Sequence, residues 1–401
     1  MSRLSILMVL VAAAPFAAGE ASAQETIKIG AVQSMTGSFN PIGKQVMAGA
    51  RLYLQEHGYT MAGKKIEILL KDDTSLPDIG KRLAQELIVN DKVALMLGGI
   101  TPSTLTIAPL TVEAKIPMIV AVSGASITVE RSPYMVRTSF TNGQSSSVMA
   151  EWATKNGAKK IVTLVNDWTP GLEAEKAFTD VAVKGGAEII AALRVPLANP
   201  DFAPFLQRTR DLKPDKLFVF VPNQQAGPLV TQFIERGMDK SGIRLISSGD
   251  LTSDDDLPNM TDAMLGLVTA HHYSMLHKSA INKAYVEAFR KAYGIRPAFH
   301  SVAGYDAMHL LHQALEKISG NANGDTLMAA MKGMSWESPR GQIAIDPETR
   351  DIIQNEYIRR VEKVNGELYN IEFATIEAVK DPFHGRLGRR GAEITVRSSK
   401  P

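Results

Sequence analysis

The sequence predicts an α/β fold of two Rossmann-like lobes, in which parallel sheets are flanked by helices. Strand-like and helix-like segments alternate once an N-terminal apolar run has ended, and this rhythm starts again after Phe140. The chain has 401 residues, of which 45% are hydrophobic and 21% charged, so it is long enough for two or three ordinary domains. This composition is typical of a folded globular protein and excludes a disordered or collagen-like chain.

The first lobe is expected to begin with an apolar strand that contains Ile27, Ile29 and Val32. A loop rich in glycine and proline follows, and then a helix-like run from Gln45 to His57. The series continues with a strand, a helix, a strand, a helix and a strand at Ile66–Leu70, Leu76–Ile88, Val93–Leu97, Thr104–Ala114 and Met118–Val122.

The second lobe is expected from a second series of alternating helices and strands. In chain order they are Ser145–Lys155, Ile161–Val165, Leu172–Val183, Glu188–Leu193, Phe202–Leu212, Leu217–Val221, Gly227–Arg236 and Arg244–Ser247. Further on, Ala307 to Ile318 carries its apolar residues on one helical face. Near the end, the segments Tyr357–Val364 and Glu367–Thr375 are expected to be strands around a turn at Asn365-Gly366.

The N-terminus has the parts of a secretory signal peptide. Arg3 gives a basic start, Leu4–Ala18 is an apolar run, and the segment ends with Ala21-Ser22-Ala23. The alternative, a membrane anchor, needs roughly 20 apolar residues, and Gly19-Glu20 end this run too early. Cleavage at the end of residues 1–23 predicts a soluble periplasmic protein whose mature chain does not insert into a membrane.

Several kinds of chemistry find no support in the sequence. There is no cysteine, and the formal net charge of +2 gives no reason to expect a nucleic-acid partner. Gly58–Lys65 is close to a phosphate-binding P-loop, but Lys65 replaces the Ser/Thr of that motif and the segment precedes a strand instead of a helix. His309 and His312 are three residues apart without a third ligand nearby, so no metal site is expected. No catalytic motif is present, and neither an enzyme nor a cofactor is predicted.

Small and hydroxylated residues follow two predicted strands of the first lobe. Gly98-Gly99 precede Ser103 and Thr104 at a helix start, and Ser123-Gly124-Ala125-Ser126 follows the next strand. Ligands of open parallel sheets bind at the carboxyl ends of the strands, where helix N-termini offer N–H groups. These loops suit a carboxylate held by neutral donors, although a role of Ser103 as a helix cap explains the pattern equally well.

Two residues of the second lobe hold comparable positions after predicted strands. Trp168 is a plausible wall for an apolar or aromatic ligand, and Asp250 is able to accept a hydrogen bond or pair with an ammonium group. An ordinary core tryptophan and a helix-capping aspartate are the alternatives.

The order and spacing of ten short segments, Pro170-Gly171 among them, carry a resemblance to a known family. They are Ile27-Lys28-Ile29-Gly30, Met35-Thr36-Gly37, Leu97-Gly98-Gly99, Ile116-Pro117-Met118-Ile119, Ser123-Gly124-Ala125-Ser126, Asn166-Asp167, Pro170-Gly171, Gly249-Asp250-Leu251-Thr252, Ala270-His271-His272-Tyr273 and Gly304-Tyr305-Asp306. From about Ile27 to Pro382, the chain resembles the type I periplasmic solute-binding proteins of branched-chain amino-acid (leucine/isoleucine/valine) ABC transporters.

This resemblance implies a ligand enclosed between two lobes that are joined by a hinge of three chain crossings. We expect the crossings near Thr141, Tyr273 and Arg350. The predicted divisions are a signal peptide at 1–23, a first lobe at 24–140 plus 274–349, a second lobe at 141–273 plus 350–384, and a flexible basic tail at 385–401.

The resemblance also implies which residues hold the ligand. In the family, hydroxyl groups at the third helix start and in the next loop bind the carboxylate, and Ser103, beside Thr104, and Ser126 match these positions. The Ala125 carbonyl would accept a hydrogen bond from an ammonium group.

The second lobe is expected to complete the site. Trp168 would close over the ligand, because Pro170-Gly171 replaces the Tyr-Gly that is usual in the family. Asp250 would pair with the ammonium group, and Tyr273 would line the cleft.

The predicted function is that of an extracytoplasmic substrate-binding protein of an ABC importer. Closure of the lobes would trap a small carboxylate, namely a branched-chain or other hydrophobic amino acid, and deliver it to a membrane permease. The chain is expected to act as a monomer. Two alternatives remain: the same fold binding an aromatic acid of the benzoate or cinnamate type, and a ligand-sensing module for a receptor.

Overall fold

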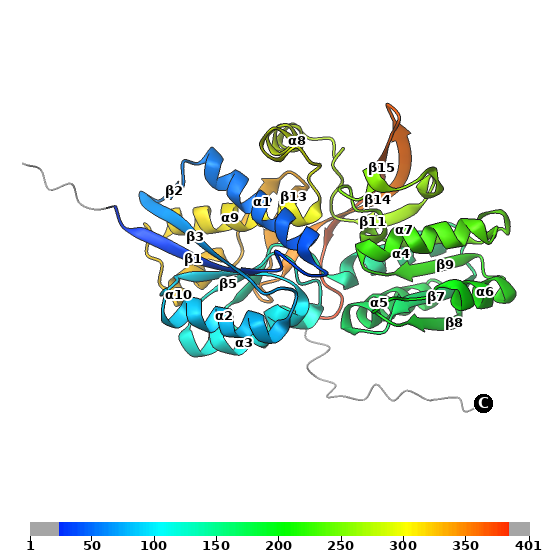
Figure 1. Ribbon diagram of the computed structural model, residues 1–401, viewed down its shortest axis with the longest axis horizontal. Helices are drawn as coiled ribbons and strands as arrows, with labels where there is room; N and C mark the ends of the chain where they lie inside the picture. Colours follow the sequence, from blue (N-terminus) through cyan, green and yellow to red (C-terminus); the bar gives the residue numbers. More distant parts are fainter. Residues whose placement is uncertain (1–23, 385–401) are drawn as a thin grey trace, which may run out of the picture.

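The computed structural model describes residues 24–384 and has two lobes, which Figure 1 shows side by side. The predicted signal peptide, residues 1–23, and the predicted tail, residues 385–401, lie outside the described residues. Between residues 24 and 384, no helix has both the length and the apolar character that a membrane span requires.

The first lobe contains a six-stranded sheet that is parallel except for one short edge strand. Its spatial order is β2 (Thr60–Met61), β3 (Lys64–Asp72), β1 (Thr26–Gln33), β4 (Leu95–Gly98), β5 (Met118–Val120) and β6 (Met135–Arg137). The helices of this lobe are α1 (Asn40–Glu56), α2 (Pro77–Val89), α3 (Thr101–Ala114), α8 (Ala280–Tyr293), α9 (Phe299–Lys317) and α10 (Gly324–Met331). The returning helix α9 packs against α1, and their apolar faces share a core with β1 and β4.

The second lobe contains a nine-stranded mixed sheet. Its spatial order is β12 (Ser335–Ser338), β13 (Gly341–Ile345), β14 (Ile352–Val364), β11 (Val268–His271), β10 (Arg244–Ser248), β9 (Lys216–Phe220), β7 (Lys160–Asn166) and β8 (Glu188–Val195), with β15 (Glu367–Val379) paired to β14. The helices of this lobe are α4 (Asn142–Lys155), α5 (Thr169–Lys184), α6 (Ala203–Leu212) and α7 (Asn223–Glu235).

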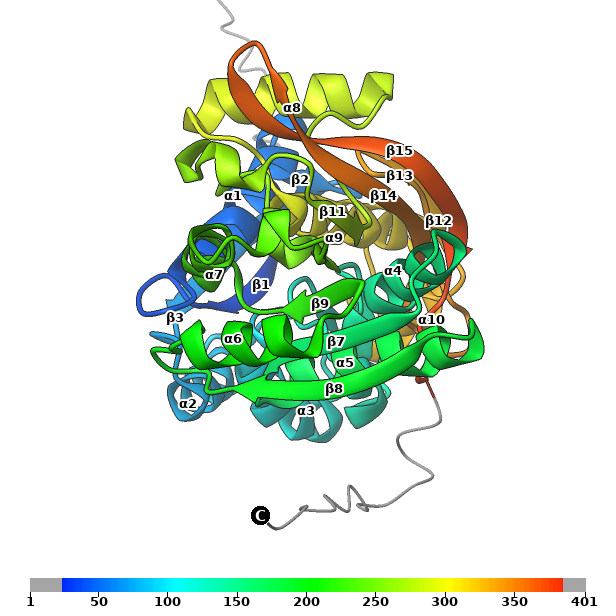
Figure 2. The same cartoon turned by 90° about the vertical axis from the view of Figure 1, so that its right-hand side faces the viewer.

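The β14–β15 hairpin extends from the second lobe to the loop that follows α8, as Figure 2 shows. Its turn is Asn365-Gly366, where both residues have positive φ, 51° and 89°, as a two-residue hairpin turn requires. Arg296 holds the tip, because its Nη1 donates to the Leu368 carbonyl over 2.7 Å. The predicted hairpin is therefore present, with longer strands than expected.

The two lobes share structure at the hinge. The chain passes from β6 to α4 through residues 138–141, and from β11 to α8 through residues 272–279. The third crossing leads from β13 to β14. Strand β13 hydrogen-bonds to β14 of the second sheet, while its side chains Ile343 and Ile345 pack into the core of the first lobe. This strand, which the sequence assigned wholly to the first lobe, thus contributes to both.

Five helices start earlier than the sequence predicted, and the first of them, α1, begins at Asn40, five residues before Gln45. Helices α3, α4 and α5 begin at Thr101, Asn142 and Thr169, three residues before the expected starts, and α7 begins at Asn223, four residues before. Proline is tolerated at the first helical positions because no intrahelical N–H is needed there. Prolines lie near the starts of α1, α3, α5 and α7, where they favour a loop in the sequence, whereas α4 has a glycine, Gly143, near its start.

Glu356 is a fully buried carboxyl group on β14, where it accepts a hydrogen bond from Ser145 Oγ over 2.9 Å. Burial raises its pKa to about 8, and burial likewise raises the pKa of Glu173 to about 7. A carboxyl group with a raised pKa holds its proton more tightly in the folded state, so it stabilises the fold at low pH. That stabilisation is lost as the pH rises from the unfolded pKa, near 4.3, to the folded pKa.

We expect the free energy of unfolding to fall between about pH 6.5 and 8, by up to about 1.4 kcal/mol per pH unit for Glu356, while Glu173 adds to the fall mainly below about pH 7. Below about pH 6.5 the buried His271, His272 and His300 act in the opposite direction, because burial lowers the pKa of each imidazole. Glu356→Gln removes the titrating group, so the free energy of unfolding of this variant should fall less steeply with pH. Urea titrations at pH 6.5, 7.2 and 8 measure this dependence. The control is Glu151→Gln, at an exposed position on α4, which should show the same pH dependence as wild type. If Glu356→Gln also shows the wild-type dependence, the raised pKa of Glu356 is contradicted.

Candidate ligand-binding cavity

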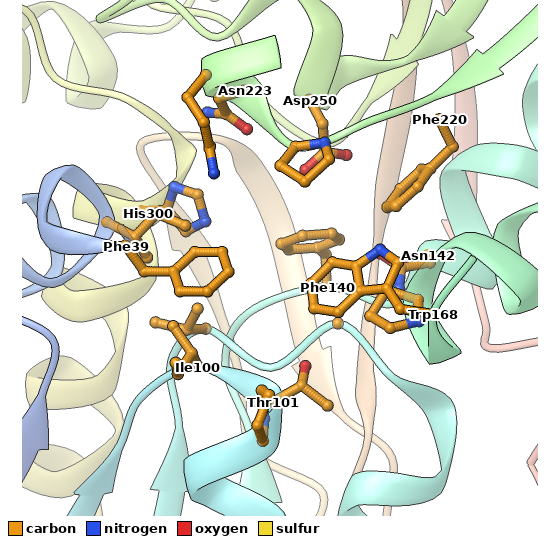
Figure 3. A pocket seen from close by; sticks show the side chains of 17 residues that line it. Phe39, Ile100, Thr101, Phe140, Asn142, Trp168, Phe220, Asn223, Asp250 and His300 are labelled. Atoms are coloured by element: carbon orange, nitrogen blue, oxygen red, sulfur yellow. The ribbon is translucent and has the colours of Figure 1, made fainter. Parts of the chain in front are cut away.

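A cavity of about 70 Å³ lies between the lobes, several times the space that one water molecule needs. Residues of both lobes and of the first crossing form its walls, as Figure 3 shows. From the first lobe come Phe39, Ile42, Ile100, Thr101, Pro102, Val122, Gly124 and His300; from the crossing comes Phe140; from the second lobe come Asn142, Trp168, Pro170, Phe220, Pro222, Asn223, Gln224 and Asp250. A volume of this size restricts the ligand to a small molecule.

Aromatic side chains from four separate segments form much of the wall. Phe39 and Trp168 lie side by side across the cleft, with ring centroids 6.3 Å apart and ring planes within 15°. Phe140 adds a third ring from the first crossing, and Phe220 comes from the end of β9. Flat apolar surfaces of this kind favour a ligand with a planar apolar body.

Helix N-termini surround the cavity. Helices α3, α4 and α7 begin at the lining residues Thr101, Asn142 and Asn223, and α5 begins directly after Trp168. The N–H groups of a first helical turn have no partner inside the helix, and the helix dipole makes this end partly positive. The cavity therefore favours an anion although no lysine or arginine is among the lining residues.

Two buried N–H donors at the cavity have no hydrogen-bond partner within residues 24–384. They are Nδ2 of Asn142 and Nε1 of Trp168. A buried donor without a partner costs about 1–3 kcal/mol, so these two groups favour a ligand that supplies an acceptor.

Asn142 belongs to the part of the cavity formed by α3 and the loop after β5. Its backbone N–H donates to the Gly124 carbonyl over 2.9 Å. In the same loop, Ser123 Oγ donates to Thr101 Oγ1 over 2.9 Å. These bonds hold Thr101, Gly124 and Asn142 together, and we call them the donor end of the cavity.

Asp250 lies at the opposite end from Thr101, as Figure 3 shows. One of its carboxylate oxygens accepts a hydrogen bond from Ser248 Oγ over 3.0 Å. Burial raises the pKa of Asp250 to about 6, so the group is mostly ionised at neutral pH. The short 3₁₀ segment that carries Asp250, Gly249–Thr252, packs against α7.

His300 adds a neutral polar group to the wall, because burial lowers the pKa of its imidazole to about 3. Arg137 is a buried cation that contacts the loop at the donor end without lining the cavity. Its guanidinium pairs with Asp351 over 2.6 Å and donates to the carbonyls of Ser123 and Ala125. The partial positive charge at the donor end is therefore supplied by helix dipoles and N–H groups.

Trp168 and Asp250 are the two sequence-predicted site residues that line the cavity. Ser103 and Thr104 do not line it. The Ser103 hydroxyl donates to Asp73 Oδ2 over 2.6 Å, and the Thr104 hydroxyl donates to the Gly99 carbonyl over 2.9 Å. Since α3 starts three residues earlier than expected, the position at the helix start is taken by Thr101.

The structure gives Ala125, Ser126 and Tyr273 other contacts, and they are not among the lining residues either. The Ala125 carbonyl accepts a hydrogen bond from Arg137 Nη2 over 2.8 Å. Ser126 donates from its backbone N–H to Glu173 and from its hydroxyl to Asp381. Tyr273 is fully buried, and its hydroxyl donates to Asn282 over 3.1 Å.

The sequence interpretation missed several lining residues, among them Phe39, Thr101, Phe140, Asn142 and Phe220. A signal for three of them was present: Phe39 precedes a helix, and Thr101 and Asn142 precede proline and glycine at helix starts. Across residues 24–384, His, Asp and Glu do not gather in threes with a geometry that would hold a metal ion.

Comparison with known proteins places this fold and cavity in a family. A family model described as "Periplasmic binding protein" matches residues 26–366. The chain belongs to this family. Among relatives, the "Leu/Ile/Val-binding protein homolog 6" of Brucella abortus is 38% identical over 375 residues, which cover 91% of this chain and 95% of the relative.

Solved structures of family members have the same fold. A solute-binding protein of an ABC transporter from Rhodopseudomonas palustris BisB5, in complex with 3,4-dihydroxybenzoic acid, is 59% identical with a TM-score of 0.86, covering 89% of this chain and 99% of that one. Another, from R. palustris HaA2 in complex with p-hydroxybenzoic acid, is 39% identical with a TM-score of 0.87, covering 90% and 100%. The predicted family, fold class and role as a solute-binding protein are confirmed.

Proposed function

We propose that this periplasmic binding protein captures a hydroxylated benzoate between its lobes and delivers it to a membrane ABC permease. The carboxylate would lie at the donor end, against Thr101 and Asn142. The ring would pack among Phe39, Phe140 and Trp168, and a ring hydroxyl would donate to Asp250.

The separation of the donor end from Asp250 carries this proposal. A benzoate with a hydroxyl at the para position has its carboxylate and that hydroxyl on opposite sides of a planar ring, which matches two polar ends separated by aromatic walls. In an amino acid, by contrast, the carboxylate and the ammonium group are attached to the same carbon. Both would need their partners close together, whereas Asp250 lies across the cavity from Thr101.

The relatives support the same class of ligand. The structures at 59% and 39% identity are complexes with 3,4-dihydroxybenzoic acid and p-hydroxybenzoic acid. A branched-chain amino acid is the second candidate, because Asp250 is a suitable partner for an ammonium group and the Brucella relatives are named for leucine, isoleucine and valine.

Family membership supports a membrane permease as the partner. Ligand would favour the closed arrangement of the lobes by its higher affinity for that state. We propose that the protein acts as a monomer after removal of residues 1–23, that it transports without catalysing a reaction, and that its partner is a permease and not a receptor.

Titration calorimetry with protein that has been unfolded, washed free of ligand and refolded tests the ligand class. We expect 3,4-dihydroxybenzoate and 4-hydroxybenzoate to bind at least tenfold more tightly than benzoate, and leucine to give no measurable binding. Binding of leucine in preference to the hydroxybenzoates would overturn the proposal in favour of the second candidate.

A further inference from the structure

A second, larger hollow of about 740 Å³ adjoins the ligand-binding cavity. Two residues, Phe39 and Gln224, line both spaces. Phe39 comes from the first lobe, at the start of α1, and Gln224 comes from the second lobe, in the first turn of α7. The two side chains therefore form a partition between an inner cavity and an outer hollow.

The loop that carries Phe39 is held in place by its neighbours. The Phe39 backbone N–H donates to Ser75 Oγ over 3.1 Å, and Ser75 Oγ donates to the Thr36 carbonyl over 3.0 Å. Gly37 has a φ of +78°, and a Cβ at this position would lie 2.5 Å from the Thr74 carbonyl oxygen. Because this turn is fixed against residues 74–75, the Phe39 ring is presented to the cleft from a defined position.

The outer hollow has a lining of mixed character. Leu197 and Phe202 give it apolar surface, and Ser38 and Asn199 give it polar groups. Its second-lobe wall is kept in shape by Gln225, whose Nε2 donates to the Leu197 carbonyl over 2.8 Å. Such a surface suits a short alkyl or ether substituent that leaves the inner cavity.

Phe39 lies to the side of the line between Thr101 and Asp250, as Figure 3 shows. If the carboxylate and the para hydroxyl of a benzoate occupy those two ends, a substituent at the meta position projects sideways from this line. In one of the two orientations of the ring, it projects toward Phe39.

We propose that Phe39 is a specificity-determining residue, which limits the meta substituent of the ligand by closing the passage to the outer hollow. This inference rests on the proposed function. The outer hollow then forms a second compartment of the site, and the Phe39 side chain excludes 3-alkoxy-4-hydroxybenzoates whose chains would otherwise enter it.

The test is a ligand series in which only the meta group grows: 3,4-dihydroxybenzoate and the 3-methoxy, 3-ethoxy and 3-propoxy derivatives of 4-hydroxybenzoate. Wild-type affinity is expected to fall at least tenfold from 3-hydroxy to 3-ethoxy. In Phe39→Ala it should fall less than threefold across the whole series. Each variant is compared with its own affinity for 3,4-dihydroxybenzoate, so a general loss from the missing Phe39–Trp168 contact does not affect the result.

Two further variants make the outcome specific. Phe39→Trp should keep the steep wild-type fall in affinity with the length of the meta group. Phe373→Ala removes an exposed aromatic ring on β15, away from both spaces, and should match wild type. Equal dependence on chain length in wild type and Phe39→Ala would overturn the inference while leaving the proposed function intact. Failure of wild type to bind 3,4-dihydroxybenzoate would instead overturn the proposed function.

Discussion

Replacing Asn142 by aspartate is expected to weaken binding of 4-hydroxybenzoate at least a hundredfold. Asn142 Nδ2 is buried at the donor end and has no partner within residues 24–384, so a ligand carboxylate is its natural acceptor. Aspartate has almost the same shape, but it replaces two donor hydrogens with a negative charge facing the ligand's own. A like-charge pair with little access to water is strongly unfavourable.

This substitution should leave the fold intact. Asn142 is the first residue of α4, where an acidic side chain interacts favourably with the helix dipole. Titration calorimetry measures the affinity and thermal unfolding without ligand checks stability. The control is Asn156→Asp, the same change at the exposed C-terminal end of α4, which should not alter affinity. An affinity of Asn142→Asp within threefold of wild type would remove Asn142 from the site.

Replacing Asp250 by alanine is expected to abolish the preference for hydroxylated over unsubstituted benzoate. A hydrogen bond to a charged group contributes about 1.5–3 kcal/mol, which corresponds to a preference of roughly 10- to 150-fold in wild type. Without the carboxylate, 4-hydroxybenzoate and benzoate should bind with affinities within threefold of each other. Benzoate itself should bind no more weakly than to wild type, since it offers nothing for Asp250 to accept.

The ratio of the two affinities, measured by calorimetry at pH 7.5, is the readout. At this pH Asp250 is ionised in wild type, because its pKa is about 6. Asp167→Ala, at an exposed position next to Trp168 and outside the cavity lining, serves as the matched control and should keep the wild-type ratio. If Asp250→Ala retains the hydroxyl preference, Asp250 does not contact the hydroxyl group.

The sequence predicted the architecture well because that architecture depends on local patterns. Alternating strands and helices, the apolar stripe of α9 and the Asn365-Gly366 turn are all encoded within a few neighbouring residues, and the structure contains each of them. Trp168 and Asp250 line the cavity, as expected from their places two residues after the ends of β7 and β10; that they bind the ligand stays a prediction.

The other site residues were harder to predict, for two physical reasons. A helix turns about 100° per residue, so placing the start of α3 at Thr104 instead of Thr101 directs attention to Ser103, whose hydroxyl binds Asp73 thirty residues away. The second reason is that a polar group near the ligand can already be hydrogen-bonded within the protein. The Ala125 carbonyl is engaged by Arg137, and such a contact depends on the folded arrangement of separate strands and loops.

The most direct test of the account is a crystal structure of the protein in complex with 4-hydroxybenzoate, in which the two ends of the ligand are chemically distinct. We predict that the carboxylate lies within hydrogen-bonding distance of the Thr101 backbone N–H and Asn142 Nδ2, and that the hydroxyl lies against Asp250. A ligand bound in the reverse orientation, with its carboxylate toward Asp250, or bound outside the cavity, would contradict it.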